Sequence, residues 1–209
     1  MTRIEQLIAA YPDLDRCVPD IEAAFQILST CYHNGGKVLT CGNGGSAADA
    51  EHIVGELMKG YLLKRPVSDE IRARLVSASP EDDDYLASRL QGALPAISLV
   101  SQTSLLSAIS NDTAADMGFA QQVYAYGQEG DVLIGLSTSG NSRNVILAMQ
   151  VARALGLRTI GLTGPTGGAL KPLCEVCICV PAENTPAIQE RHLPIFHVLC
   201  AMLEEEFFI

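Results

Sequence analysis

Short apolar runs alternate with segments of helical spacing along most of this chain. Runs that are apolar nearly throughout predict strands over residues 37–41, 96–100, 131–136, 158–162 and 176–180. Apolar residues at helical spacing predict helices over residues 4–10, 20–33, 47–61, 104–110, 114–126, 144–155 and 186–207. Strands without polar alternation, separated by helices, are typical of a parallel sheet with both faces covered. The pattern therefore predicts an α/β fold with a doubly wound parallel sheet, an N-terminal helical arm and a long C-terminal helix.

The predicted helix boundaries carry recognisable end signals. Gly35-Gly36 follows the helix at 20–33 as a C-terminal stop. The last helix is expected to begin with Thr185 as its N-cap and Pro186 in its first turn.

One stretch interrupts the alternation of strands and helices. It contains the turn-like Ser77-Ala78-Ser79-Pro80 and the acidic run Glu81-Asp82-Asp83-Asp84. We expect a surface excursion here, with a helix around residues 85–90. Because the alternation resumes afterwards and extends the same sheet, residues 1–209 are predicted to form a single domain with a surface insertion at 67–92.

Glycine- and serine-rich turns follow two of the predicted strands. They read Cys41-Gly42-Asn43-Gly44-Gly45-Ser46 and Ser137-Thr138-Ser139-Gly140-Asn141-Ser142. Each opens a predicted helix whose free N–H groups point at the turn, and glycine lets the backbone approach an anion closely. Ordinary loops share this composition, but a position between a buried strand and a helix favours an anion cradle. Two such turns predict a site for a phosphorylated small molecule at the carboxyl ends of the strands.

Composition narrows the class of ligand. The chain is 48% hydrophobic and 18% charged, as in an ordinary globular protein. Its net charge of -10 argues against a nucleic-acid partner, which needs a basic face, but not against a phosphate ester held by backbone groups. The first residues lack a signal-peptide pattern, and no run reaches the roughly 18 apolar residues of a membrane span. We therefore expect a cytoplasmic protein with no membrane partner.

The seven cysteines are an odd number and favour reduced thiols. Most fall in predicted apolar elements, where a thiol packs as a small hydrophobe. Cys174-Glu175-Val176-Cys177 is a lone CxxC, without the second pair that a zinc knuckle needs. The pattern favours core or loop thiols over a metal site.

Two histidines, a carboxylate and an amide are spaced as a zinc set would require. His52 and Glu56 lie four apart on one predicted helix, and Gln189 and His197 lie eight apart on the last helix. A site forms only if the two helices meet, within one subunit or across two. His192 and Glu190 are alternative ligands on the last helix. Isolated pairs with this spacing are common, so spacing alone favours solvated surface residues.

Several of these segments together resemble the SIS domain family, and more closely its phosphoheptose isomerase branch. The matching segments are 41–52, Ser110-Asn111-Asp112, 135–142 and Ile188-Gln189-Glu190. The resemblance implies a flavodoxin-like SIS fold and a cytoplasmic homotetramer with active sites shared between subunits. It also implies an isomerase that converts sedoheptulose 7-phosphate to D-glycero-D-manno-heptose 7-phosphate, for lipopolysaccharide heptose.

The resemblance assigns roles to individual residues. It implies one Zn²⁺ per site, held by His52, Glu56, Gln189 and His197, with Glu56 and His197 as the catalytic acid–base pair. The implied sugar contacts are Asn43, Gly44, Gly45, Ser46, Asn111, Asp112 and Gln189. The implied phosphate contacts are Ser137, Thr138, Ser139 and Ser142. On the residues alone, Asn111-Asp112 is equally well explained as a helix-ending turn.

Two departures from the family pattern keep other functions open. Ala187 stands where the family commonly has arginine, and the connection at 67–92 is usually short. One alternative is an isomerase of another ketose phosphate. The other is a non-catalytic sister branch that binds DnaA at replication initiation and does not keep the full metal and acid–base set. Because this chain keeps all four residues, the sequence favours the enzyme.

Overall fold

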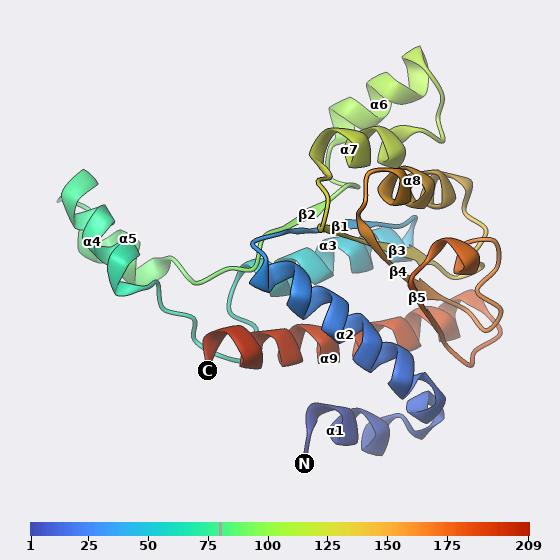
Figure 1. Cartoon of the computed structure of the whole chain (residues 1–209), viewed down its shortest axis with the longest axis horizontal. Coiled ribbons are helices and arrows are strands. Elements are labelled where there is room, and N and C mark those ends of the chain that lie inside the picture. The colour runs from blue at the N-terminus through green and yellow to red at the C-terminus, as the bar shows by residue number, and fades with distance from the viewer. Residues whose placement is uncertain (80) are drawn as a thin grey trace.

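Five parallel strands form the central sheet of the computed structural model, which describes residues 1–79 and 81–209 (Figure 1). They are β1 Val38–Cys41, β2 Ala96–Ser98, β3 Val132–Ser137, β4 Arg158–Thr163 and β5 Val176–Cys179. Their order is β2-β1-β3-β4-β5, with every neighbouring pair parallel. This is the flavodoxin-like order, and it confirms the predicted doubly wound α/β fold.

Helices cover both faces of the sheet. One face carries α2 (Val18–His33), α3 (Gly45–Met58) and α9 (Thr185–Phe208). The other carries α7 (Gly118–Tyr126) and α8 (Arg143–Ala154), with α6 (Thr103–Asp112) packed beyond α7. Successive strand residues serve opposite layers: Leu133 joins the α7–α8 side, whereas Ile134 joins the α9 side. The continuous apolar runs read in the sequence are therefore strands buried from both faces.

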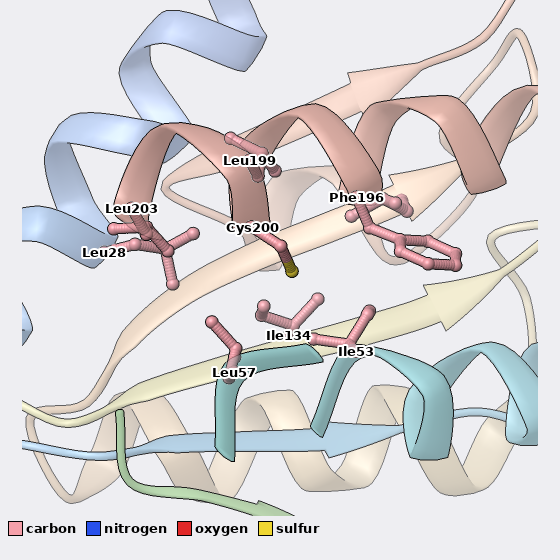
Figure 2. Close-up of a pocket in the computed structure, with 9 residues that line it drawn as sticks. Leu28, Ile53, Leu57, Ile134, Phe196, Leu199, Cys200 and Leu203 are labelled. Atoms are coloured by element: carbon pink, nitrogen blue, oxygen red, sulfur yellow. The ribbon is translucent and has the colours of Figure 1, made fainter. Parts of the chain in front are cut away.

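The side chains between α9 and the sheet leave almost no space. Figure 2 shows Phe196 and Cys200 of α9 above Ile53 and Leu57 of α3 and Ile134 of β3. The gap among them measures about 10 Å³ and is lined by apolar side chains. A buried water needs polar partners, so this space belongs to a dry core and is not a ligand site.

The N-terminal arm packs along the C-terminal helix. α1 (Arg3–Ala10) and a 3-10 turn (Pro12–Cys17) precede α2. Arg3 pairs with Glu205 of α9 at 2.7 Å, and Arg191 of α9 pairs with Asp13 at 2.6 Å. In the part of the chain that the structure describes, no helix combines the length and apolar character of a membrane span.

A two-helix arm extends away from the sheet (Figure 1). It consists of α4 (Asp69–Ala78) and α5 (Asp83–Arg89), and a bridge between Pro66 and Gln91 closes its base. The sequence predicted only the second helix. α4 was missed because none of its residues is buried, so it lacks the apolar stripe that marks a packed helix. Pro80, part of the turn expected here, lies outside the described residues.

Several predicted helix ends were wrong, among them the start of α7, which lies at Gly118 instead of residue 114. α3 ends at Met58 instead of residue 61, because the next backbone N–H groups bond the side chain of Glu204. The N-cap of α9 is Asn184 instead of Thr185: the Asn184 side chain accepts a hydrogen bond from the Ala187 N–H at 3.0 Å.

Candidate functional site

The two turns expected to hold an anion lie at one edge of the sheet. The glycine turn (residues 41–46) follows β1, and the serine turn (residues 137–142) follows β3, the neighbouring strand. The strand order reverses between β1 and β3, and ligand crevices form at such positions. The side-chain amides of Asn43 and Asn144 join the turns by reciprocal hydrogen bonds of 2.9 Å. Both turns therefore border one crevice.

The hydroxyls of the serine turn are positioned by their neighbours. Ser137 Oγ and Ser142 Oγ lie 2.9 Å apart, and Ser139 Oγ accepts a hydrogen bond from the Asn141 N–H at 3.1 Å. Ser142 is also the N-cap residue of α8, so the free N–H groups of that helix face the turn. Ordered hydroxyls next to a helix N-terminus suit a bound phosphate.

One glycine makes the serine turn possible. Gly140 has a φ of 65°, and a Cβ at this position would lie 2.1 Å from the Gly167 carbonyl oxygen. Only glycine fits a left-handed position against another backbone segment. Beside this packed backbone, Thr138 and Ser139 line an open pocket of about 300 Å³.

The glycine turn packs against its neighbours as tightly as the serine turn does. Gly44 has a φ of 57°, and a Cβ on Gly42 would meet the Ser46 carbonyl oxygen at 2.4 Å. A Cβ on Gly45 would lie 2.4 Å from Gln189 Nε2, so the Gln189 amide rests against the start of α3. The structure thus brings Gln189 from α9 to the glycine turn.

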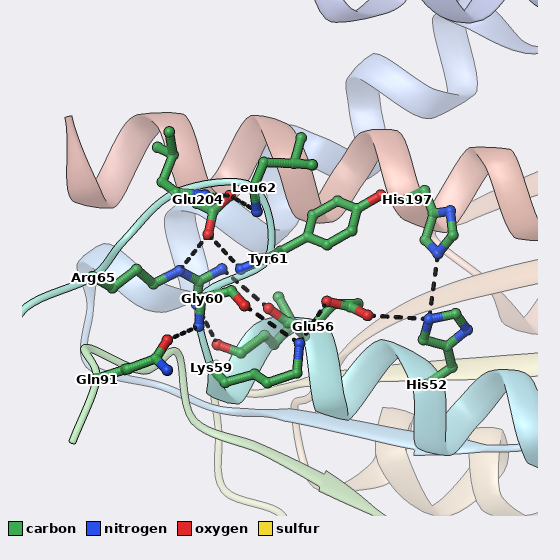
Figure 3. Close-up of polar contacts among 12 residues, drawn as sticks. His52, Glu56, Lys59, Gly60, Tyr61, Leu62, Arg65, Gln91, His197 and Glu204 are labelled. Atoms are coloured by element: carbon green, nitrogen blue, oxygen red, sulfur yellow. Dashed lines mark hydrogen bonds and ion pairs between the residues drawn. The ribbon is translucent and has the colours of Figure 1, made fainter. Parts of the chain in front are cut away.

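Two turns farther along the same pair of helices, three titratable side chains meet. His52 Nε2 lies 3.1 Å from Glu56 Oε1 and 3.4 Å from His197 Nε2 (Figure 3). His52 and Glu56 come from consecutive turns of α3, and His197 comes from α9. The candidate zinc set can form only if these two helices meet, and they do so within one chain. The roles of the three side chains stay predictions.

Burial tunes this His–Glu–His cluster. Glu56 is 9% exposed, and its second oxygen, Oε2, lies 3.2 Å from Lys59 Nζ. Burial lowers the pKa of His197, and the adjacent His52 lowers it further, while Glu56 acts in the opposite direction. His197 is therefore neutral at pH 7, as a metal ligand or an acceptor of a proton must be.

The segment that supports this cluster was not predicted from the sequence. The Tyr61 ring lies 5.4 Å from the His197 ring, and the Tyr61 N–H donates to Glu204 at 2.8 Å (Figure 3). Buried Arg65 bonds Glu204 Oε1 at 2.7 Å and the Glu56 carbonyl oxygen at 3.0 Å. Lys59 stands one helical turn beyond Glu56, a spacing that the sequence does reveal. Tyr61 and Arg65 carried no such signal: Tyr61 was the last residue of the predicted helix, and Arg65 fell in the connection after it.

Other predicted site residues lie elsewhere in the chain. Asn111 and Asp112 form the exposed end of α6 and bond each other at 2.8 Å. His192 is fully buried and contacts the Thr163 carbonyl oxygen at 3.3 Å, and burial lowers its pKa to about 4. Glu190 is exposed. The structure thus joins neither His192 nor Glu190 to the His–Glu–His cluster.

The cluster offers donors that suit zinc. Two nitrogens on one tetrahedral zinc, each about 2.0–2.1 Å from the metal, stand about 3.4 Å apart. The two Nε2 atoms of His52 and His197 have that separation. A single Nε2 carries at most one hydrogen, so His52 cannot donate to both Glu56 and His197. Over residues 1–79 and 81–209, however, no three His, Cys, Asp or Glu side chains already surround one metal position. The donor types and the histidine spacing fit zinc, while the complete set is not preassembled.

Comparison with known proteins shows the family of this chain. The SIS domain model matches residues 14–84 and 85–164. A phosphoheptose isomerase of Aneurinibacillus thermoaerophilus is 42% identical over 177 residues, which are 85% of this chain and 76% of that protein. The solved phosphoheptose isomerase of Neisseria gonorrhoeae is similar with a TM-score of 0.73 and 34% identity, covering 96% of this chain and 94% of that one. That of Francisella tularensis gives 0.72 and 30%, covering 98% and 100%.

Proposed function

The chain belongs to the phosphoheptose isomerase branch of the SIS domain family, and we propose that it is an aldose–ketose isomerase of a phosphorylated sugar. The substrate we infer is sedoheptulose 7-phosphate, converted to D-glycero-D-manno-heptose 7-phosphate. The contact of His52 with both Glu56 and His197 at the crevice edge carries this proposal. It unites an acid, a base and a candidate metal position on helices that are far apart in sequence.

The reaction moves a proton between adjacent carbons through an enediol. It needs a base for the C–H proton and an acid at the carbonyl oxygen. Glu56 is the base in this proposal: its carboxylate lies 3.1 Å from His52 Nε2 and 3.2 Å from Lys59 Nζ, between the two. His197 exchanges the proton at the oxygen, and the Tyr61 ring holds its imidazole in place.

The far end of the substrate supplies binding energy. Ser137, Thr138, Ser139 and Ser142 bind the phosphate together with the N–H groups at the start of α8. Asn43, Gly44, Gly45 and Ser46 bind the sugar hydroxyls across the crevice. Anchoring the phosphate fixes the reacting carbons at the base, which lowers the entropic part of the barrier.

A divalent metal completes this assignment. His52, Glu56 and His197 would hold zinc, with Gln189 as the fourth donor after its amide turns from Gly45 toward them. Bound zinc polarises a carbonyl oxygen and orients hydroxyls. The test for it is metal content and thermal stability with and without a chelator, compared with a His52→Asn variant.

Assembly into a homotetramer gives a role to Asn111 and Asp112, which lie apart from the His–Glu–His cluster. Asn111 and Asp112 are exposed at the end of α6 and bond each other. We infer that they reach the sugar in a neighbouring subunit of a homotetramer. Sedimentation of the purified protein measures the assembly, and a monomer would exclude this role.

An isomerisation assay over five- to seven-carbon ketose phosphates tests the activity. We expect turnover of sedoheptulose 7-phosphate, and its loss by at least about a hundredfold in Glu56→Gln and His197→Asn. Glu190→Gln, an exposed carboxylate on α9, is the matched control and retains activity. Activity on a shorter ketose phosphate instead would replace sedoheptulose 7-phosphate as the inferred substrate. No turnover on any of them, with no bound metal, would favour the DnaA-binding alternative.

A further inference from the structure

Three cysteines that the proposed reaction does not use gather at the edge of the sheet. Cys177 and Cys179 belong to β5, the outermost strand, and Cys174 directly precedes it. Cys177 Sγ and Cys179 Sγ lie 3.7 Å apart. All three thiols are free and only half-buried, unlike the thiols of Cys41 and Cys200 in the core.

A glycine on the neighbouring strand makes room for two of these sulfurs. Gly161 of β4 pairs with Cys177 in the sheet register. A Cβ at Gly161 would lie 2.7 Å from Cys174 Sγ and 3.2 Å from Cys177 Sγ. Both sulfurs thus converge on the space that a side chain would otherwise fill. Cys174 also lines an open surface pocket of about 290 Å³, so small solutes reach this thiol.

The surroundings make the two thiols chemically unlike. The neighbouring Cys174 thiol, aided by Thr163 and Cys179, lowers the pKa of Cys177 to about 6 against the opposing effect of burial. The Thr163 hydroxyl lies 3.6 Å from Cys177 Sγ. The contact with Cys177 and burial both raise the pKa of Cys174, whose S–H donates to the Leu170 carbonyl oxygen at 3.3 Å. These opposite shifts favour the thiolate at Cys177 and the neutral thiol at Cys174, the arrangement of a reactive CxxC pair. Burial instead raises the pKa of Cys41 to about 12, so that thiol is inert.

We propose that Cys174 and Cys177 form a redox-active dithiol that a peroxide converts to an intrachain disulfide. The Cys177 thiolate attacks one peroxide oxygen, the O–O bond breaks, and the hydroxide released takes up a proton to become water. The Cys177 sulfenic acid is then attacked by Cys174 sulfur, which loses its proton as the hydroxyl leaves in a second water. Two thiols and one hydrogen peroxide thus give one disulfide and two waters.

Cys174, not Cys179, is the partner in this disulfide. Cys177 and Cys179 are two residues apart on one extended strand, which separates their Cα atoms by about 6.6 Å. That is near the upper limit for a disulfide, and the strand pairing with β4 holds them there. Cys174 lies outside the strand, at the end of the 3-10 turn before it, and its sulfur faces the same space beside Gly161 as that of Cys177. Cys179 serves as a hydrogen-bond donor to the thiolate.

Peptide mapping after oxidation tests the proposal. The folded protein is treated with stoichiometric hydrogen peroxide, its remaining thiols are alkylated, and it is cleaved after glutamate without reduction. Cleavage at Glu175 separates Cys174 from Cys177, so only a disulfide keeps the two peptides together. We expect this linked pair, and we expect iodoacetamide to label Cys177 at pH 7 about tenfold faster than Cys41 or Cys200 in the reduced protein.

Matched variants locate the bond. The linked pair should disappear in Cys177→Ser and Cys174→Ser and persist in Cys179→Ser, and a sulfenic-acid probe should trap Cys177 in Cys174→Ser. Circular dichroism confirms that each variant is folded. A folded wild-type protein without the linked peptides, or a Cys174→Ser variant that pairs Cys177 with Cys179, would overturn the proposal. These readouts do not depend on isomerase activity.

Discussion

Removing the Glu204 side chain should destabilise the protein more than any exposed charge change on the same helix. Glu204 and Arg65 are each 1% exposed and form an ion pair of 2.7 Å. Glu204 also accepts the N–H groups of Tyr61, Leu62 and Leu63 at 2.8, 2.7 and 3.1 Å. Glu204→Ala therefore leaves a buried guanidinium and three backbone donors without their acceptor.

The size of the effect follows from these contacts. Breaking a buried ion pair by removing one partner costs about 3–5 kcal/mol, because the other charge stays buried. The loop 61–63 is partly exposed, so water replaces some of the lost hydrogen bonds and we expect the lower half of that range. Glu205→Ala is the matched control: its pair with Arg3 is partly exposed, with side chains 38% and 29% accessible, and is worth no more than about 1 kcal/mol.

Urea unfolding of the variants measures these free energies. The double variant Arg65→Met with Glu204→Leu removes both charges and should recover at least half of the loss. Arg65 also bonds the Glu56 and Leu57 carbonyl oxygens, so Glu204→Ala should lower kcat although it touches no reacting group. Equal stabilities of Glu204→Ala and Glu205→Ala would refute the reasoning.

Three further predictions concern other parts of the molecule. His192 has a pKa of about 4 when folded and about 6.5 when unfolded, so the unfolded state binds more protons as the pH falls. The free energy of unfolding should therefore fall by about 3 kcal/mol from pH 6.5 to pH 4. Unfolding titrations of His192→Gln should lack this loss, and an unchanged dependence of stability on pH would contradict the prediction. Gly140→Ala places a Cβ 2.1 Å from the Gly167 oxygen, whereas the Cβ of Gly130→Ala, at a φ of 87°, meets nothing within 4 Å. In thermal melts Gly130→Ala should lose roughly 1–2 kcal/mol of stability and Gly140→Ala at least twice as much. Equal losses would mean that the serine turn is not tightly packed. Ser142→Ala removes the 2.9 Å contact with Ser137 and should raise KM about tenfold with a smaller change in kcat. Steady-state kinetics measures both constants, and a fall in kcat alone would count against phosphate binding at the serine turn.

The fold could be predicted from the sequence because its signals are local. Strands such as β3 and β4 are buried on both faces and read as continuous apolar runs. The end of α3 could not be predicted, since it is set by Glu204, more than 140 residues away. α4 has no buried face, so its sequence contains no periodic stripe to detect.

The candidate site was predictable where motif and backbone coincide. The two glycine- and serine-rich turns were marked by their composition between a strand and a helix, whereas the spacing of His52 and Glu56 alone favoured surface residues and only the family resemblance assigned them roles. The contact with His197 depends on how α3 and α9 pack, which no local pattern encodes. Tyr61 and Arg65 act through tertiary contacts alone and were therefore missed.

Solvent deuterium in the product tests the central assignment most directly. Isomerisation of sedoheptulose 7-phosphate is run in deuterium oxide, and the aldose product is read by proton NMR. If Glu56 moves a proton through an enediol, the product carries deuterium at C2, and Glu56→Gln forms none of it. Undiminished formation of the labelled aldose by Glu56→Gln would contradict the account, as would turnover in which the C1 hydrogen is carried to C2 with no deuterium taken up from the solvent.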